Sequence, residues 1–363
     1  MSVLRLTLAG VLCVATAHAA REKPLYSQEQ IQDFCRRFEI WPSRFHFPPE
    51  SFLGTGYAPP GGYVKDFGVL FHDGRLHLFH IDGRPEERCT VSGNEICFGH
   101  ASTADFRHWI RHRMPLAVGD RPWQNEHVRA PFVTQWNSRF YMFYMAAGRR
   151  TPGVLASAVC DDLETWTKSD GPIVQAKGRD PFVRDQDDRI DLYYTANAGG
   201  VEVVSGTDMI HWSTPHQVIR NPKRAPAESS SVHRVGDRWV LWYNDYVGVD
   251  GASGDFRTMY VFSKDPLNFD CHGLKEFDFK TPLQVNRDSY DWVEKASIPV
   301  SIELVEKGND TWLVCYFRWY EGKFRLFFGA VDWSFDPARI EEITTDAKLE
   351  ETLSRVHDRG SHD

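Results

Sequence analysis

The chain has 363 residues, of which 42% are hydrophobic, and its 42 Lys and Arg against 50 Asp and Glu give a formal net charge of −8. No tract concentrates the Lys and Arg that nucleic acids and anionic membranes attract, so we expect neither as a partner. The apolar content is sufficient for a substantial core, and a neutral ligand fits this charge better.

Residues 1–20 have the features of a secretory signal peptide. Arg5 precedes an apolar run that ends in the small residues Ala17 and Ala19, and the run is too short to cross a bilayer. We expect cleavage near Ala19 or Ala20 and a secreted protein, either extracellular or periplasmic. No later apolar stretch reaches the roughly 20 residues of a membrane helix.

Residues 21–54 are interpreted as a lead-in, with a helix predicted within SQEQIQDFCRRF, and residues 341–363 as a polar tail that is also predicted to be helical. Cys13 leaves with the signal peptide. Cys89 and Cys97 share one loop-like stretch, and we expect them to form a disulfide in an oxidising compartment. No cysteine spacing resembles a zinc site or a redox pair, so the cysteines predict no metal.

Residues 55–340 contain five copies of one pattern, in which a short apolar strand and a turn precede an aromatic-rich strand. The copies align on Val69, Val133, Val183, Val232 and Val300, a spacing of about 50 to 70 residues that is typical of repeated units. Alternating apolar and polar residues, with turn pairs such as Asp-Gly, predict antiparallel hairpins. We therefore predict an all-β fold, a five-bladed β-propeller. A two-sheet sandwich would not explain five copies.

A second pattern, Asp-x-x-x-aromatic, lies between these copies at residues 105–109, 162–166, 208–212 and 265–269. We interpret it as structural, because an Asp in a turn accepts hydrogen bonds from nearby backbone amides. The aromatic residue is expected to pack between sheets. These residues are therefore not candidates for a site.

Charged residues gather at equivalent positions of the repeats. In a propeller the innermost strands begin at one mouth of the channel, so equivalent positions converge there. The pairs at these positions are Lys65-Asp66, Arg129-Ala130, Arg179-Asp180, Glu228-Ser229 and Ala296-Ser297. Close carboxylates raise one another's pKa, and glycoside hydrolysis uses such acids to protonate the leaving oxygen and to act on water or the anomeric carbon. Asp66, Asp180 and Glu228 are therefore the catalytic candidates, and Glu294 is a rival acid.

Four segments carry a family resemblance: KDFGVLFHDGRLHLFHIDG, FGHASTADFRHWIRH, GRDPFVRDQDDRIDLYYT and AESSSVHRVGDRWVLWYND. They resemble the five-bladed propeller superfamily of arabinanases and xylosidases (family 43) and fructosidases (family 32). The resemblance implies that Asp66 is the general base or nucleophile, that Asp180 stabilises the transition state and that Glu228 is the acid.

Two branches of this superfamily remain open. Arg179-Asp180-Pro181 and FGHA from Phe98 resemble family 32, in which the arginine and aspartate hold the fructosyl ring. Its usual Asn-Asp-Pro-Asn-Gly is here Lys-Asp-Phe-Gly, its Glu-Cys is here Glu-Ser, and no residues remain for its C-terminal β-sandwich. A lone propeller is typical of family 43. The arabinanases of that family often place a His on the fifth blade beside an axial calcium, whereas residues 292–297 contain none. We therefore predict no cofactor, and the sequence leaves an axial calcium open without supporting it.

The function predicted first is hydrolysis of an arabinose- or xylose-containing oligo- or polysaccharide with inversion, with Asp66 as base, Glu228 as acid and Asp180 as the orienting acid. Fructoside hydrolysis with retention is the alternative, with Asp66 as nucleophile. The carboxyl separation distinguishes them, at about 5–5.5 Å for retention and about 6.5–9.5 Å for inversion. A non-catalytic, lectin-like propeller is a third interpretation, and three acids in register argue against it.

Other residues are candidates for contact with the substrate. Arg179 and Arg129 share the predicted channel mouth, His100 belongs to a family-like motif, and Trp123 with His127 could form the wall of a subsite. The 13% aromatic content also fits a ligand with sugar rings, which stack on exposed aromatic faces.

Overall fold

The computed structural model describes residues 25–36, 45–46, 51–87, 91–186, 188–220, 227–247, 255–281 and 298–358. The predicted signal peptide, Cys89 of the expected disulfide and the rival acid Glu294 lie outside these residues and stay predictions. Within the described part of the chain, the helices are all too short or too polar to cross a membrane.

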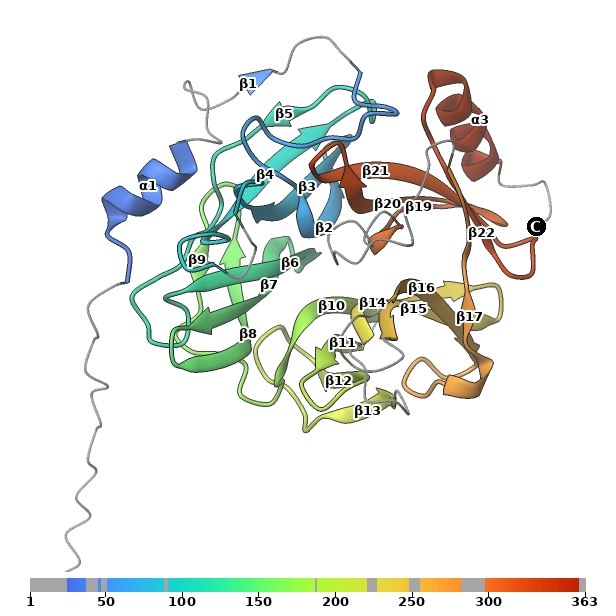
Figure 1. Ribbon diagram of the computed structural model, residues 1–363. Coiled ribbons are helices and arrows are strands. Elements are labelled where there is room, and N and C mark those ends of the chain that lie inside the picture. Colours follow the sequence, from blue (N-terminus) through green and yellow to red (C-terminus); the bar gives the residue numbers. More distant parts are fainter. Residues whose placement is uncertain are drawn as a thin grey trace, which may run out of the picture.

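Five sheets stand around a common axis, each built from consecutive strands (Figure 1). Blade 1 contains β2 (Lys65–His72), β3 (Arg75–Asp82), β4 (Cys97–Thr103) and β5 (Ile110–Arg111), with β1 (Phe45–His46) added at its outer edge. Blade 2 contains β6 (His127–Trp136), β7 (Arg139–Gly148), β8 (Thr151–Cys160) and β9 (Thr167–Lys168). Blade 3 contains β10 (Gly178–Gln186), β11 (Arg189–Ala196), β12 (Val201–Gly206) and β13 (His216–Ile219).

Blades 4 and 5 complete the ring. Blade 4 contains β14 (Ala227–Val235), β15 (Arg238–Val247), β16 (Asp255–Ser263) and β17 (Lys275–Glu276), with the 3₁₀ helix η1 (Cys271–Gly273) before β17. Blade 5 contains β19 (Val300–Lys307), β20 (Thr311–Tyr320), β21 (Lys323–Asp332) and β22 (Arg339–Glu342), and β18 (Asp278–Lys280) pairs in parallel with β22. The prediction of an all-β, five-bladed propeller is confirmed.

The innermost strands β2, β6, β10, β14 and β19 form a closed ring in which each strand contacts the next. Each carries a register shift near its start. At each shift one non-glycine residue takes a left-handed backbone conformation: Asp66 (φ 34°), Ala130 (φ 48°), Asp180 (φ 53°), Ser229 (φ 51°) and Ser301 (φ 50°). This shared bulge defines the equivalent positions of the five blades.

The bulge corrects the predicted alignment of the fifth blade. Its equivalent pair is Val300-Ser301, and not Ala296-Ser297, because Ser301 carries the left-handed bulge. Leu304 pairs with Val314 as Val69 pairs with Leu78 in blade 1. The sequence pattern misplaced the register by four residues because a strand alternates with a period of two, so a shift by four keeps the same face.

The Asp-x-x-x-aromatic segments are structural, as predicted. Oδ1 of Asp162 accepts hydrogen bonds from the backbone amides of Glu164 (2.9 Å) and Thr165 (2.7 Å), and Asp105 and Asp208 bind amides in the same way. The aromatic residue then packs on the preceding blade. The pairs are Trp166 with Phe79, Trp212 with Phe143, and Trp109 of blade 1 with Phe328 of blade 5.

The ring closes between blade 5 and the segment that precedes blade 1. Tyr57 exchanges backbone hydrogen bonds with Leu326 (2.9 and 2.8 Å), and the amide of Val64 donates to Phe324 (3.1 Å). The ring of Tyr57 also stacks on Trp109 at 4.5 Å. Because these contacts join residues far apart in the chain, they hold the first and last blades together.

Two helices flank the sheets where helices are predicted. Helix α1 (Gln28–Arg36) buries Ile31 and Phe34 in the same core cluster as blade 1. Helix α3 (Asp346–His357) is capped by Thr345 and packs on β20. Arg107 of blade 1 reaches Asp346 and Glu350 on α3, both at 2.6 Å.

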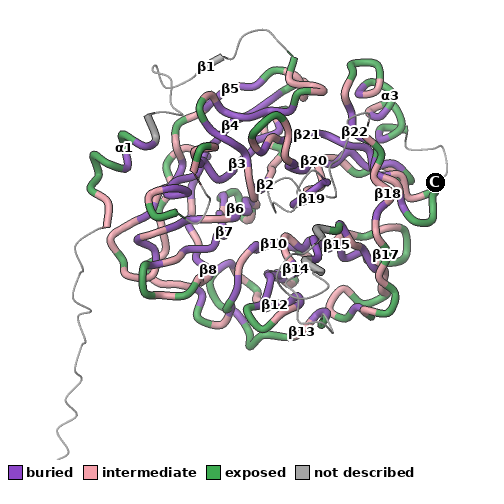
Figure 2. The backbone as a smooth tube through the Cα atoms, viewed as in Figure 1, coloured by how far each residue is buried: buried purple, intermediate pink, exposed green. Residues whose placement is uncertain are grey.

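Among the described residues, the core forms three clusters that lie between neighbouring blades. The first unites blades 1, 2 and 5, the second blades 2, 3 and 4, and the third blades 4 and 5. Figure 2 shows the buried backbone along the strands and the exposed backbone at the loops. Stability therefore depends on close contact between sheets.

Gly68 lies at a close contact between two strands of the inner ring. A Cβ at this position would lie 2.7 Å from the carbonyl oxygen of Pro131 and 2.8 Å from Cα of Phe132, both backbone atoms of blade 2. Gly68→Ala is expected to lower the free energy of unfolding by about 1–3 kcal/mol, measured by urea denaturation. Gly171→Ala, which meets no atom within 4 Å, is the control, and equal losses in the two variants would refute this account.

Candidate active site

The five left-handed residues of the inner strands line one cavity on the axis: Asp66, Ala130, Asp180, Ser229 and Ser301. The convergence expected from the repeats is therefore observed, and two of the three candidate acids share this cavity. Glu228 directly precedes Ser229 on β14. The bulge places these residues together because it occurs at the same point of every inner strand.

Asp180 is the most deeply buried of the three candidate acids, with a side chain that is 10% exposed. Its Oδ2 accepts hydrogen bonds from the hydroxyl of Thr195 and from the amide of Ser229, both at 3.1 Å. Burial and the nearby Glu228 raise the pKa of Asp180 to about 7, although Arg179 opposes the shift. The hydrogen bonds fix Oδ2 and leave Oδ1 as the oxygen that can meet a ligand.

Asp66 occupies the equivalent position on blade 1, and its side chain is 19% exposed. Burial raises its pKa; Lys65, at 3.4 Å, lowers it, and the charges of Glu95 and Glu228 raise it further. Asp66 thus interacts electrostatically with Glu228, as does Asp180. The three candidate acids form one electrostatic group.

Glu228 is held by the neighbouring blade. Nε of Arg179 donates to its Oε1 at 2.8 Å, and Nη2 of Arg179 donates to the same oxygen. Arg179 also lies 3.8 Å from Oδ2 of Asp180. The arginine predicted to contact the substrate therefore joins two of the acids.

Sequence reasoning missed Glu95, which lies in the loop before β4 and is fully buried. Its Oε1 accepts hydrogen bonds from Tyr63 (2.9 Å) and Lys65 (3.1 Å), and its Oε2 lies 2.6 Å from Nε of Arg129. Burial alone would raise the pKa of Glu95, but Lys65 and Arg129 outweigh burial and lower it. Arg129, a predicted substrate contact, is thus paired with Glu95. No local motif marks Glu95, because its partners come from other segments.

Glu303 is a second carboxyl that the sequence analysis missed, because the fifth blade was misaligned. It lines the axial cavity with Asp66 and Asp180, and burial raises its pKa well above the usual value. A calcium ion takes six to eight oxygen ligands, several of them ionised. Among the described residues the acids on the axis do not bring three ligand atoms within 4.8 Å of one another, and the hydroxyls of Ser229 and Ser301 bind each other at 2.6 Å.

The structure does not bring the remaining candidates to the carboxylates. His100 lies on β4, buried between the rings of Phe79 and His112, and lines a different cavity. Trp123 is partly buried and packs against the first core cluster. Nδ1 of His127 bonds to the carbonyl of Asn94 at 3.0 Å.

The fold is shared with solved glycoside hydrolases. RS223 β-xylosidase is similar with a TM-score of 0.59 and 14% identity, over 78% of this chain and 96% of that chain. An exo-1,5-α-L-arabinanase from a bovine ruminal metagenomic library has a TM-score of 0.58 and 15% identity, over 77% of this chain and 98% of that chain. The Bombyx mori GH32 β-fructofuranosidase BmSUC1 has a TM-score of 0.59 and 14% identity, over 89% of this chain and 70% of that chain. These similarities show that the chain shares the five-bladed propeller fold of these enzymes.

The family follows from a sequence model. The model for the glycosyl hydrolases family 32 N-terminal domain matches residues 57–266, a segment that contains Asp66, Asp180 and Glu228. The match covers more than half of the chain, so the chain belongs to glycosyl hydrolase family 32 and is a glycoside hydrolase. No curated protein sequence matched it.

The raised pKa of Asp180 predicts a pH-dependent cost in stability. With a pKa of about 7 in the folded protein against 3.8 ordinarily, Asp180 binds its proton more tightly when folded. Its ionisation therefore destabilises the protein as the pH rises from about 4 to 7, and the cost is absent below both values. Asp180→Asn is expected to raise the thermal midpoint by a few degrees at pH 8 and to leave it nearly unchanged at pH 4.

Thermal melts followed by circular dichroism at the two pH values check this expectation. Asp188→Asn, at an exposed position near the β10–β11 turn, is the control and should change neither midpoint. An equal change in the thermal midpoint at pH 4 and pH 8 for Asp180→Asn would contradict the raised pKa of Asp180.

Glu95→Gln tests the buried charge cluster. The substitution leaves Lys65 and Arg129 beside a neutral amide, and breaking a buried ion pair costs on the order of 3–5 kcal/mol. Glu350→Gln removes only a surface partner of Arg107, and such pairs contribute about 1 kcal/mol or less. We expect urea denaturation to show the larger loss for Glu95→Gln; similar losses would mean that Glu95 does not hold the cluster.

Proposed function

We propose that the protein hydrolyses β-fructofuranosidic bonds with retention of configuration. The observation that carries this proposal is Arg179-Asp180-Pro181, which lies inside the segment matched by the family 32 model and joins the third blade to Glu228. The fold neighbour from Bombyx mori is named a β-fructofuranosidase, which agrees with this choice. The substrate would be an oligo- or polysaccharide.

In this mechanism Asp66 is the nucleophile. One of its oxygens attacks the anomeric carbon while Glu228 gives a proton to the leaving oxygen, so the glycosidic bond breaks as the bond to Asp66 forms. Glu228 then takes a proton from a water molecule. The oxygen of that water attacks the anomeric carbon, and the bond between this carbon and Asp66 breaks. Asp66 and Glu228 interact electrostatically, which is consistent with two groups that act on the same bond.

Asp180 and Arg179 would orient the sugar. Oδ2 of Asp180 is already bonded to Thr195 and Ser229, so Oδ1 would accept a hydrogen bond from a ring hydroxyl. Both bonds from Arg179 go to Oε1 of Glu228, so Oε2 would carry the proton for the leaving group. A sugar that accepts hydrogen bonds from Arg179 would also weaken the hydrogen bonds from Arg179 to Glu228.

A second candidate is inverting hydrolysis of arabinose- or xylose-containing glycans, with Asp66 as base. It is favoured by the inner strand of blade 1, which reads Lys65-Asp66-Phe67-Gly68 where family 32 usually has Asn-Asp-Pro-Asn-Gly. Neighbours named as a β-xylosidase and an arabinanase also share the fold, with TM-scores of 0.59 and 0.58.

We also propose, from residues 1–20, that the enzyme is secreted.

Release of reducing sugar from sucrose, inulin, levan, arabinan, xylan and arabinoxylan tests these candidates. We expect activity on fructosides and a loss of about 10³-fold or more in kcat for Asp66→Asn. Asp73→Asn, in the exposed turn at the other end of the same strand, should leave activity unchanged. NMR of the first-formed sugar distinguishes retention from inversion.

Each other outcome has a defined meaning. Activity only on arabinan or xylan, with inversion, would favour the second candidate. No hydrolysis of any substrate, with sugar binding retained in both wild type and Asp66→Asn, would support a lectin-like propeller and overturn the enzymatic roles proposed for the three acids.

A further inference from the structure

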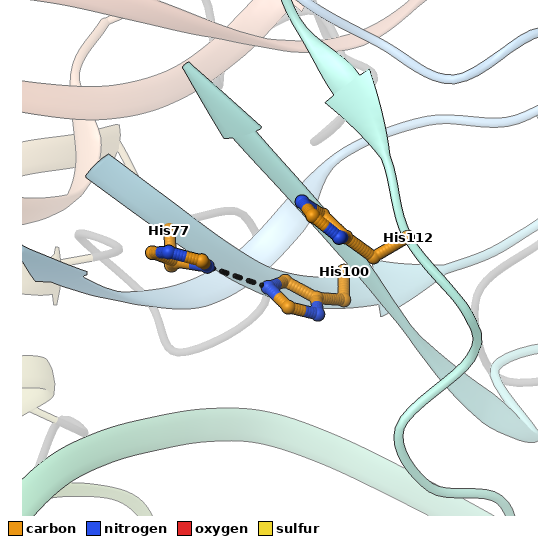
Figure 3. A group of neighbouring side chains, drawn as sticks. All are labelled: His77, His100 and His112. Atoms are coloured by element: carbon orange, nitrogen blue, oxygen red, sulfur yellow. Dashed lines mark hydrogen bonds between the residues drawn. The ribbon is translucent and has the colours of Figure 1, made fainter. Parts of the chain in front are cut away.

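Three histidines of blade 1 form a cluster that the catalytic mechanism does not use. His77 comes from β3, His100 from β4 and His112 from the segment just after β5, and Figure 3 shows their rings side by side. A hydrogen bond of 2.9 Å joins Nδ1 of His77 to Nε2 of His100. One ligand nitrogen from each ring lies within 4.8 Å of the others. A small rearrangement of the rings can therefore direct all three nitrogens at one metal ion.

The cluster lies toward the opposite end of blade 1 from the carboxylates. His77 pairs with Leu70 near the end of β2, whereas Lys65, beside Asp66, pairs with Ile81 at the far end of β3. The histidines also line a separate cavity of about 500 Å³ between blades 1 and 2. A ligand can therefore reach the cluster without entering the axial site.

The surroundings hold these imidazoles in place. His77 and His100 are 8% and 1% exposed, so the protein interior encloses both rings. Nε2 of His112 is bonded to the hydroxyl of Ser102 at 2.8 Å. Such a bond orients a metal-binding histidine through its other nitrogen.

The cavity wall favours a cation over an anion. Four carboxylates line it, those of Asp73, Asp161, Asp162 and Glu164, against Arg75, while Arg139 pairs with Asp161 from outside the lining. A cavity dominated by one sign of charge concentrates the opposite ion. Neutral imidazoles select Zn²⁺, Cu²⁺ or Ni²⁺, whereas Ca²⁺ and Mg²⁺ prefer oxygen ligands.

We propose that His77, His100 and His112 bind one divalent transition-metal ion of the zinc and copper class. The ion lies between Nδ1 of His77 and Nε2 of His100, in place of the hydrogen of their hydrogen bond. The imidazole that donated this hydrogen then carries it on its other ring nitrogen. Because the rings of His100 and His112 stack at 4.3 Å with planes 20° apart, the less buried His112 turns to direct its nitrogen at the ion. Water or a wall carboxylate supplies the fourth ligand.

The test is Zn²⁺ binding to the full-length protein after treatment with EDTA, measured by competition with a chromophoric chelator. We expect one tightly bound ion, an increase in the thermal midpoint on its addition, and at least a tenfold weaker affinity in His77→Gln and in His112→Gln. His108→Gln, which changes an exposed histidine of the same blade bonded to Asp105, should bind as the wild type does. Equal binding by the wild type and His77→Gln would overturn the proposal, as would an equal loss in His108→Gln.

A second measurement needs no variant of the cluster and therefore does not depend on whether the variants fold. Pulsed EPR of the wild-type protein loaded with one equivalent of Cu²⁺ counts the imidazoles bound to the ion. Three coordinated imidazoles are expected, and one or none would overturn the proposal.

Discussion

The site depends on one backbone feature, the bulge near the start of every inner strand. Each bulge holds a non-glycine residue in the left-handed region, at a cost of roughly 1–2 kcal/mol per residue. The ring of inner strands offsets this cost because each strand packs against two neighbours. The same distortion repeated around the axis brings Asp66, Asp180 and Ser229 into one cavity.

The charges around this cavity are arranged so that the acids differ. Lys65 and Arg129 surround Glu95 and lower its pKa, while Arg179 binds Glu228. Asp180 lies in a more buried position with a raised pKa, and burial also raises the pKa of Asp66. Burial and paired cations therefore place these neighbouring carboxyls in different electrostatic environments.

Blade 1 contributes to both the axial cavity and the proposed metal site. The start of β2 carries Asp66 to the axis, while β3, β4 and the segment after β5 gather the histidines near the other end of the sheet. Asp162 links the second site to the fold, because it accepts amide hydrogen bonds in a blade-joining turn and also lines the histidine cavity. An ion bound there would connect β3, β4 and the segment after β5.

The sequence by itself determined the number of blades and pointed to three candidate acids. Hairpin turns and strand alternation are local, so the repeats could be aligned and Asp66, Asp180 and Glu228 identified without a structure. The motifs left families 32 and 43 both open, and the model match over residues 57–266 placed the chain in family 32. Only the tertiary structure decided the register of the fifth blade, the place of Glu95 beside Lys65 and Arg129, and the separation of His100 from the axis. These features depend on contacts between segments distant in the chain, and a two-residue period contains no information about them.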